Sequence, residues 1–266
     1  MDKEILSYFN LHSMPFTKEM DISDFMEFPS ASYIHKSLIS LINVRGIGVL
    51  TGESGTGKSC LIRKIFAGLN PGLFKPLYIC HSTVSLLEFY THLAVCLGIE
   101  PSGRKSFMFR KLKERIFTLN KTHKIHPVLV IDEAHLLKTD TLQELRLLLN
   151  FEIDSFNALT ILLCGQPSLE GKFTLSMLEP LVNSISFTLQ LDSLKEEETY
   201  SYIESRISKA GNSASLFTKN AMKLVHASSS GILRSINNIA VGSLIKAFQL
   251  KSQAVEAEHV NMIITR

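Results

Sequence analysis

The chain has 266 residues, of which 45% are hydrophobic and 20% charged, a balance typical of a packed soluble protein. No stretch approaches the roughly 18 consecutive apolar residues that a membrane helix needs, and the acidic N-terminal sequence lacks the apolar core of a secretory signal. We therefore expect a cytoplasmic protein that does not enter a membrane. The four cysteines are scattered, which favours free thiols in a reducing compartment. The nine histidines show no metal-ligand spacing either.

Short apolar runs alternate with helical patterns between residues 31 and 191. Apolar residues at helical spacing predict a first helix over 31–44. The later runs predict strands at 47–50, 76–80, 127–131, 159–164 and 187–191, with helices from about 58 and over 84–97, 106–121 and 140–150. Strands that alternate with helices imply a parallel sheet covered on both faces, which is an α/β fold.

After residue 191 the strand signals stop and three helical stretches follow. The first, LKEEETYSYIESRISKAG, carries three glutamates in its first turn and ends at a glycine, and both features are helix-boundary signals. We therefore place a domain boundary near residue 192. Residues 1–191 would hold an N-terminal segment and the α/β core, and residues 192–266 a small helical domain.

The sequence GESGTGKS, residues 52–59, matches the phosphate-binding pattern G-x-x-x-x-G-K-[ST] between a predicted strand and a predicted helix. Glycines let the backbone fold around phosphates, so that amide N–H groups and the helix N-terminus face negative charge. Lys58 is placed to reach the β- and γ-phosphates, and the Ser59 hydroxyl to ligate Mg²⁺. We expect ATP and Mg²⁺ here, with ATP held by Gly52, Glu53, Ser54, Gly55, Thr56, Gly57, Lys58 and Ser59.

Two acidic residues follow the third predicted strand, in VLVIDEAH at residues 128–135. An acid at the C-terminal edge of a parallel sheet lies where ligands bind, so Asp132 is placed to hold Mg²⁺, usually through water, and Glu133 is a candidate base that polarises the attacking water. The alternative is a solvated acid pair that caps the next helix. The letters DEAH also occur in a class of helicases, but the chain has room for only one such core.

With both motifs in place, the chain resembles the AAA+ ATPases of the ExeA-like group, which includes the secretion-associated ExeA/GspA proteins and the TnsC/TniB/MuB-like regulators of transposition. The resemblance covers nearly the whole chain. It is carried by YFNLHSMPF (8–16), VLTGESGTGKS (49–59), VLVIDEAHLL (128–137), LQELRLLLNFE (142–152), ILLCGQPSL (161–169) and SSGILRSINN (229–238). It implies an AAA+ P-loop NTPase fold with a five-stranded parallel sheet, a C-terminal helical lid and ATP-dependent homo-oligomers.

The same resemblance implies two more residues of the catalytic site. Gln166, after the fourth strand, resembles the sensor-1 residue, and Arg234 resembles sensor 2. A polar side chain and a lid arginine that both reach the γ-phosphate would report hydrolysis to the lid. The alternatives are a loop amide and a solvated arginine. Residues 8–16 resemble the part of this group that packs beside adenine, with core packing as the alternative.

The resemblance fails just before the fifth strand, where relatives carry an arginine that reaches a neighbouring subunit's ATP. This chain reads EPLVNSIS there, with Asn183 and Ser184. An arginine supplied in trans contributes a factor of roughly 10³ to 10⁵ to hydrolysis. We therefore expect a slow, partner-regulated ATPase whose assembly is driven by ATP binding, with Arg146 and Lys172 as the candidate substitutes.

Positive charge is concentrated between Arg104 and Lys124, where eight basic residues and one acid give +7 and leave −4 for the rest of a chain whose total is +3. The apolar residues of the predicted helix share one face, which we expect to pack on the sheet: Phe109, Leu112, Ile116 and Leu119. The opposite face is either solvated or contacts duplex DNA, since the resembling transposition ATPases line a ring or helical filament around DNA with this region. The candidate phosphate contacts are Lys105, Arg110, Lys111 and Lys121.

Three classes of function compete. The first is an ATP-dependent regulator of DNA transposition, which assembles on duplex DNA without reading its sequence and recruits or activates a transposase. The second is the ATPase of a secretion assembly; relatives of that kind continue into a membrane helix and a periplasmic region, which we do not expect because the chain ends at Arg266. The third is a signalling NTPase that acts on protein only. We favour the first.

Overall fold

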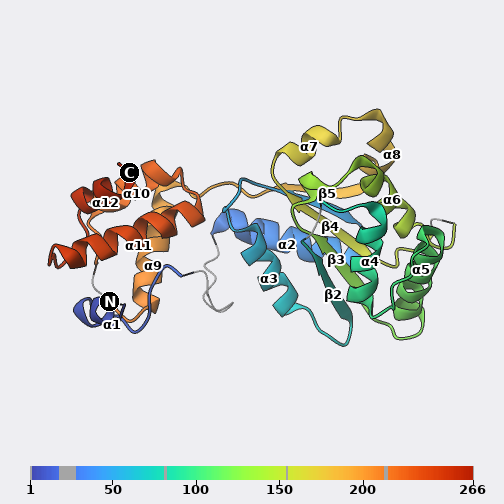
Figure 1. The fold of residues 1–266 in the computed structure, drawn as a ribbon, viewed down its shortest axis with the longest axis horizontal. Coiled ribbons are helices and arrows are strands. Elements are labelled where there is room, and N and C mark those ends of the chain that lie inside the picture. The colour runs from blue at the N-terminus through green and yellow to red at the C-terminus, as the bar shows by residue number, and fades with distance from the viewer. Residues whose placement is uncertain (1, 18–27, 81–82, 154, 213–214, 266) are drawn as a thin grey trace. The chain divides into compact units, whose positions relative to one another are not determined.

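The computed structural model describes residues 2–17, 28–80, 83–153, 155–212 and 215–265 (Figure 1). The chain divides into two compact units. The sheet unit comprises residues 30–52 and 61–191, and the helical unit comprises the described parts of residues 1–29, 53–60 and 192–266.

Five parallel strands form the sheet, as the sequence predicted, and their order in the sheet is β2-β3-β4-β1-β5. The strands are β1 (Ile47–Thr51), β2 (Phe74–Ile79), β3 (His126–Ile131), β4 (Thr160–Gly165) and β5 (Ile185–Gln190). The three inner strands β1, β3 and β4 are buried along their whole length. Burial on both faces explains why they appear in the sequence as continuous apolar runs.

Helices cover the sheet, and alternate strand residues face opposite layers because the side-chain period of a strand is two. Val128 and Val130 line one side with residues of α2 (Pro29–Val44) and α3 (Lys58–Gly68). Leu129 and Ile131 belong to the core on the other side. That core is shared with α4 (Leu86–Leu97), α5 (Lys105–Lys121) and α6 (Thr139–Leu149), and short helices follow β4 at α7 (Ser168–Lys172), η3 (Ser176–Leu178) and α8 (Glu179–Val182).

The buried stripe of α5 begins one residue earlier than the sequence predicted. Met108 is fully buried, whereas Phe109 is only partly buried at the margin of the same core. The remaining buried apolar residues of α5 are Leu112, Ile116 and Leu119, as expected. Spacings of four, four and three residues continue the stripe from Met108 along one helix face. Phe109 packs against the core as predicted but is only partly buried, because a 3.6-residue period allows either neighbour to complete the stripe and Met108 takes the fully buried position.

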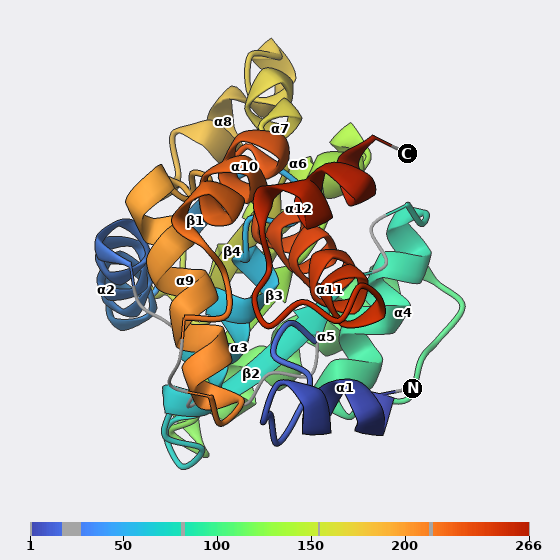
Figure 2. The same ribbon diagram turned by 90° about the vertical axis from the view of Figure 1, so that its left-hand side faces the viewer.

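The helical unit is built from α9 (Glu196–Lys209), α10 (Lys219–Ser229), α11 (Leu233–Gln249) and α12 (Ala257–Ile264), with α1 (Asp2–Tyr8) packed on α11 (Figure 2). The described residues among 1–29, a segment that we assigned to the first domain, cluster with these helices instead. Phe9 and Phe16 are buried in the core of the helical unit, and the buried Arg206 guanidinium donates to the Pro15 carbonyl. Core packing therefore describes the environment of residues 8–16 in this structure.

His126, the first residue of β3, is buried at the amino-terminal end of that strand and connects α5 to β4. The ring nitrogens of His126 lie 3.0 Å from Asn120 Oδ1 and 2.9 Å from Thr160 Oγ1. Burial, with the nearby positive charge of Arg45, lowers the pKa of His126 to about 4. The imidazole is thus neutral in the folded chain at pH values where an exposed histidine has already taken up a proton.

This depressed pKa predicts a pH-dependent stability. Between pH 6.5 and about 4 the unfolded chain binds a proton at His126 that the folded chain does not, so the free energy of unfolding falls as the pH is lowered. From pH 7 to pH 5 the loss from this residue should be about 2 kcal/mol. Urea unfolding of His126→Gln at both pH values should show a loss smaller by that amount than in the wild type. Equal losses of the free energy of unfolding in the wild type and in His126→Gln would contradict the lowered pKa of His126.

Candidate nucleotide-binding site

Three strands end at one edge of the sheet, and two of them are followed there by polar side chains. Because β3, β4 and β1 are adjacent and parallel, their carboxyl ends share that edge. The residues that follow these ends are Gly52 after β1, Asp132 after β3 and Gln166 after β4. In parallel sheets, ligands bind outside the carboxyl ends of the strands, so this edge is the candidate site.

The glycine loop connects β1 to α3 and is folded on itself. Gly55 and Gly57 adopt positive φ angles of 89° and 107°, which side-chain-bearing residues rarely adopt. The Lys58 ammonium donates to the Glu53 carbonyl at 2.9 Å, and the Thr56 hydroxyl donates to the same oxygen at 2.9 Å. Two glycines with positive φ angles and two hydrogen bonds to one carbonyl therefore hold the loop in a tight turn before α3.

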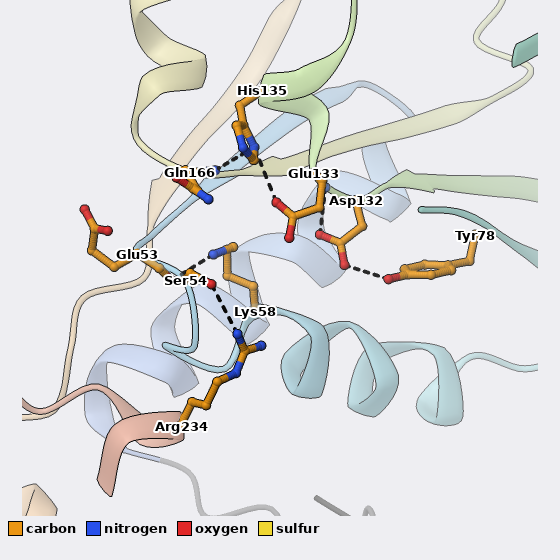
Figure 3. Close-up of polar contacts among 9 residues, drawn as sticks. All are labelled: Glu53, Ser54, Lys58, Tyr78, Asp132, Glu133, His135, Gln166 and Arg234. Atoms are coloured by element: carbon orange, nitrogen blue, oxygen red, sulfur yellow. Dashed lines mark hydrogen bonds and ion pairs between the residues drawn. The ribbon is translucent and has the colours of Figure 1, made fainter. Parts of the chain in front are cut away.

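Arg234 of the first turn of α11 contacts the glycine loop. Its guanidinium Nη1 donates to the Ser54 hydroxyl at 3.3 Å, and its backbone N–H donates to the Gly55 carbonyl at 3.1 Å (Figure 3). The loop and the start of α11 belong to the same compact unit. Of the two sensor residues expected from the resemblance, Arg234 thus contacts the glycine loop directly.

The Asp132 carboxylate is buried and held by two donors. Oδ1 accepts the Glu133 backbone N–H at 2.9 Å, and Oδ2 accepts the Tyr78 hydroxyl at 2.6 Å (Figure 3). Burial, together with this hydrogen bond, raises the pKa of the Tyr78 phenol above its ordinary value, so the phenol keeps its proton and acts as the donor. A buried carboxylate needs such partners, because desolvation otherwise penalises its charged form.

Glu133 lies on a left-handed backbone with φ of 53° and contacts a histidine. Its Oε2 lies 3.4 Å from His135 Nδ1, and the same ring nitrogen lies 3.4 Å from the backbone N–H of Gln166 (Figure 3). When Nδ1 carries a proton it donates to the carboxylate; when it does not, it accepts from Gln166. His135 therefore connects the candidate base to the segment that begins with Gln166.

Sequence reasoning missed Tyr78 and His135. Tyr78 was expected only as part of an apolar strand, and its contact depends on the pairing of β2 with β3, which the sequence does not reveal. His135 was visible only as the last letter of DEAH. Of the two substitutes for the missing arginine, Lys172 donates to the Leu137 carbonyl at 2.6 Å, while Arg146 forms no ion pair within the described residues.

Most of the four candidate DNA contacts already have partners in the chain. Lys105 pairs with Glu144, which also accepts the Tyr90 hydroxyl at 2.7 Å. Burial by itself would raise the pKa of Glu144, but the hydrogen bonds from Lys105 and Tyr90 outweigh it and hold that pKa below its ordinary value. The other contacts are Arg110 with Glu114 at 3.7 Å, Lys121 with Glu152 at 3.2 Å, and Lys111 over the Phe107 ring at 4.8 Å.

Known proteins share this architecture. Residues 42–173 match the AAA domain family. The chain is 31% identical over 214 residues to General secretion pathway protein A of Aeromonas hydrophila, and the match covers 79% of this chain but only 38% of that protein. Among solved structures, Cdc6p from Pyrobaculum aerophilum aligns with a TM-score of 0.69 at 16% identity, over 91% of this chain and 67% of the other.

Two further structures have the same fold. The Aeropyrum pernix ORC1 protein in complex with DNA aligns with a TM-score of 0.69 at 17% identity, over 93% of this chain and 67% of the other. The RuvB branch migration motor of Thermotoga maritima aligns with a TM-score of 0.62 at 16% identity, over 95% of this chain and 73% of the other. These alignments establish the fold as that of AAA+ P-loop NTPases. Among the described residues, none of the helices is long and apolar enough to span a membrane.

The contact between Arg234 and the glycine loop predicts that adding a methyl group at Gly55 destabilises the chain. A Cβ added at Gly55 would lie 2.8 Å from Arg234 Cβ, on a backbone that already disfavours it. Gly55→Ala should therefore destabilise the chain by about 1–2 kcal/mol and weaken the binding of a fluorescent ATP analogue. Gly68→Ala is the control, because a Cβ there meets nothing within 4 Å. Thermal denaturation measures the stability of both variants, and titration measures their affinity for the ATP analogue. Equal stability and equal affinity of the two variants would contradict the packing of Arg234 on the loop.

Proposed function

We propose that this chain, which carries an AAA domain with the AAA+ P-loop NTPase fold, binds ATP with Mg²⁺ and hydrolyses it slowly to switch between assembled and unassembled states. The observation that carries the proposal is the shared carboxyl edge of β1 and β3, where the glycine loop begins and where Asp132 and Glu133 follow a buried strand. A phosphate-binding loop and an acid pair on one sheet edge fit phosphoryl transfer to water.

Each residue has a role in this proposal. Lys58 and the backbone N–H groups of residues 52–59 bind the phosphates, and Ser59 and Asp132 hold Mg²⁺, for which hydroxyl and carboxylate oxygens are suitable ligands. Mg²⁺, when bound, neutralises charge that develops on the phosphate oxygens. Glu133 orients the attacking water and accepts its proton at the carboxylate. Gln166 and Arg234 contact the γ-phosphate and report its loss.

Slow hydrolysis is supported by the surroundings of Glu133 and by the missing arginine. His135 lies beside the Glu133 carboxylate, so the base is engaged within its own chain. The residues after α8 are Asn183 and Ser184, and neither can replace a guanidinium. Arg146, partly exposed on α6, is the better substitute, because the Lys172 ammonium already donates to a carbonyl of its own chain. Binding of ATP, rather than turnover, would then drive head-to-tail association.

We propose duplex DNA as the partner and recruitment or activation of a transposase as the output. Arg110 supports this proposal best among the basic residues. Its ion pair with Glu114 joins side chains that are 66% and 68% exposed, and such pairs contribute at most about 1 kcal/mol, so a phosphate can replace the acid. Lys105 is less available, because its partner Glu144 is only 17% exposed. The alignment with an ORC1 protein solved with DNA is compatible with this partner.

A second candidate is the ATPase of a secretion assembly. It is favoured by the 31% identity to a secretion pathway protein, the General secretion pathway protein A of Aeromonas hydrophila. The match covers 79% of the present chain but 38% of that protein, so this candidate is supported by only part of the relative.

Charge neutralisation separates the two candidates. Arg110→Gln combined with Lys111→Gln should lower the affinity for a duplex in the presence of Mg·ATP. It should also reduce the slope of log affinity against log salt by about 0.9 for each phosphate that the variant no longer neutralises. Lys36→Gln, an exposed lysine on α2, is the matched control. Fluorescence anisotropy over a salt series measures both quantities. If duplex DNA neither binds the ATP-bound wild type nor changes its hydrolysis rate, the DNA proposal is wrong and the secretion candidate takes its place.

A further inference from the structure

A tyrosine from the neighbouring strand reaches the candidate metal ligand. Tyr78 of β2 pairs with Val130 of β3 in the parallel ladder. Asp132 lies two residues beyond Val130, so its side chain projects on the same face as the Tyr78 side chain, at the diagonal position. The Asp132 N–H donates to the Ile79 carbonyl at 2.8 Å, which continues the ladder one residue past the end of β3. Backbone pairing therefore fixes the two side chains at hydrogen-bonding distance.

The two donors on Asp132 together define the orientation of its carboxylate. The Glu133 N–H holds Oδ1 at 2.9 Å, and the Tyr78 hydroxyl holds Oδ2 at 2.6 Å. The terminal torsion of an aspartate is otherwise broad and close to two-fold. With one donor on each oxygen, rotation about that torsion breaks at least one charge-assisted hydrogen bond, so the carboxylate plane is fixed.

We propose that Tyr78 is a positioning residue for the metal site, which holds the Asp132 carboxylate in the orientation that receives Mg²⁺, through a bound water, when Mg·ATP enters. This inference rests on the proposed ATP site. A carboxylate can accept about four hydrogen bonds, so the phenol and a metal-bound water can donate to it at the same time. The phenol therefore orders the ligand without competing for the metal.

A packing role explains the hydroxyl poorly. The Tyr78 side chain is 41% exposed on an edge strand, so its ring contributes little to the core. Replacement by phenylalanine keeps the ring and removes only the bond to Asp132. If the hydroxyl served only to attach β2 to β3, its removal would lower stability and would leave the dependence of nucleotide binding on Mg²⁺ unchanged.

The chain offers a matched control in Tyr90. Its hydroxyl also donates to a carboxylate, Glu144 Oε2 at 2.7 Å, within the same unit, and Tyr90 belongs to the core on the other face of the sheet from Val130. Tyr78→Phe and Tyr90→Phe each remove one tyrosine–carboxylate hydrogen bond. Mn²⁺, used as the probe for Mg²⁺, is titrated in the presence of a non-hydrolysable ATP analogue and followed by electron paramagnetic resonance. Affinity for a fluorescent ATP analogue is measured in parallel with Mg²⁺ and with EDTA.

We expect Mn²⁺ affinity to fall on the order of tenfold in Tyr78→Phe, with nucleotide affinity in EDTA unchanged and both quantities unchanged in Tyr90→Phe. In an Asp132→Ala background, Tyr78→Phe should have no further effect on Mn²⁺ binding. The proposal is overturned if Mn²⁺ affinity is unchanged, if the EDTA affinity falls equally, or if the effect persists without the Asp132 carboxylate. A wild type that binds no nucleotide in either condition would remove the ATP site itself, together with this inference.

Discussion

Parallel pairing of β3 with β4, and of β4 with β1, brings three carboxyl ends to one edge of the sheet, and the proposed chemistry depends on that arrangement. The inner strands are buried along their whole length, so burial of apolar side chains stabilises their arrangement in the sheet, and the polar residues that follow them do not. Polar residues at this edge are then held by neighbours. Asp132 is held by Tyr78 and by its own chain, and Gln166 by His135.

Glu133 and Gln166 are coupled through one ring nitrogen. His135 Nδ1 lies at the same distance, 3.4 Å, from the Glu133 carboxylate and from the Gln166 N–H. A single nitrogen cannot donate to the first and accept from the second at once. A ligand that draws either residue toward it would therefore favour one partner of His135 over the other. This provides a physical route by which Gln166, the proposed sensor residue, could control when the candidate base is available.

The basic stretch is less available to an external anion than its composition indicates. Two of its members, Lys113 and Arg115, donate to backbone carbonyls, and Lys121 lies over two aromatic rings as well as beside Glu152. Much of the concentrated charge thus attaches α5 to the segments around it. The basic residues that remain for a phosphate backbone are the exposed Arg104 and Lys124, and Arg110 and Lys111, whose intramolecular contacts are weak enough to exchange.

The apolar runs predicted all five strands, because buried parallel strands leave a continuous signal, and the glycine loop and Asp132 followed from their places after strands. Other features were not accessible from the sequence. A helix period cannot distinguish Met108 from Phe109 at the margin of a stripe, and α12 has too short a pattern to be recognised. The packing of residues 8–16 with α9–α12 is a contact between distant segments. The bond between Tyr78 and Asp132 requires the register of β2 on β3.

The central claim is that the ATP-bound state assembles this chain on duplex DNA. Electron microscopy of Glu133→Gln with Mg·ATP and duplex DNA tests it most directly, because the substitution should slow hydrolysis without removing the loop that binds phosphate. The account predicts ordered rings or helical filaments around DNA for Glu133→Gln, and isolated particles for Lys58→Ala under the same conditions. Isolated particles for both variants, or assemblies that form equally well without ATP, would contradict it.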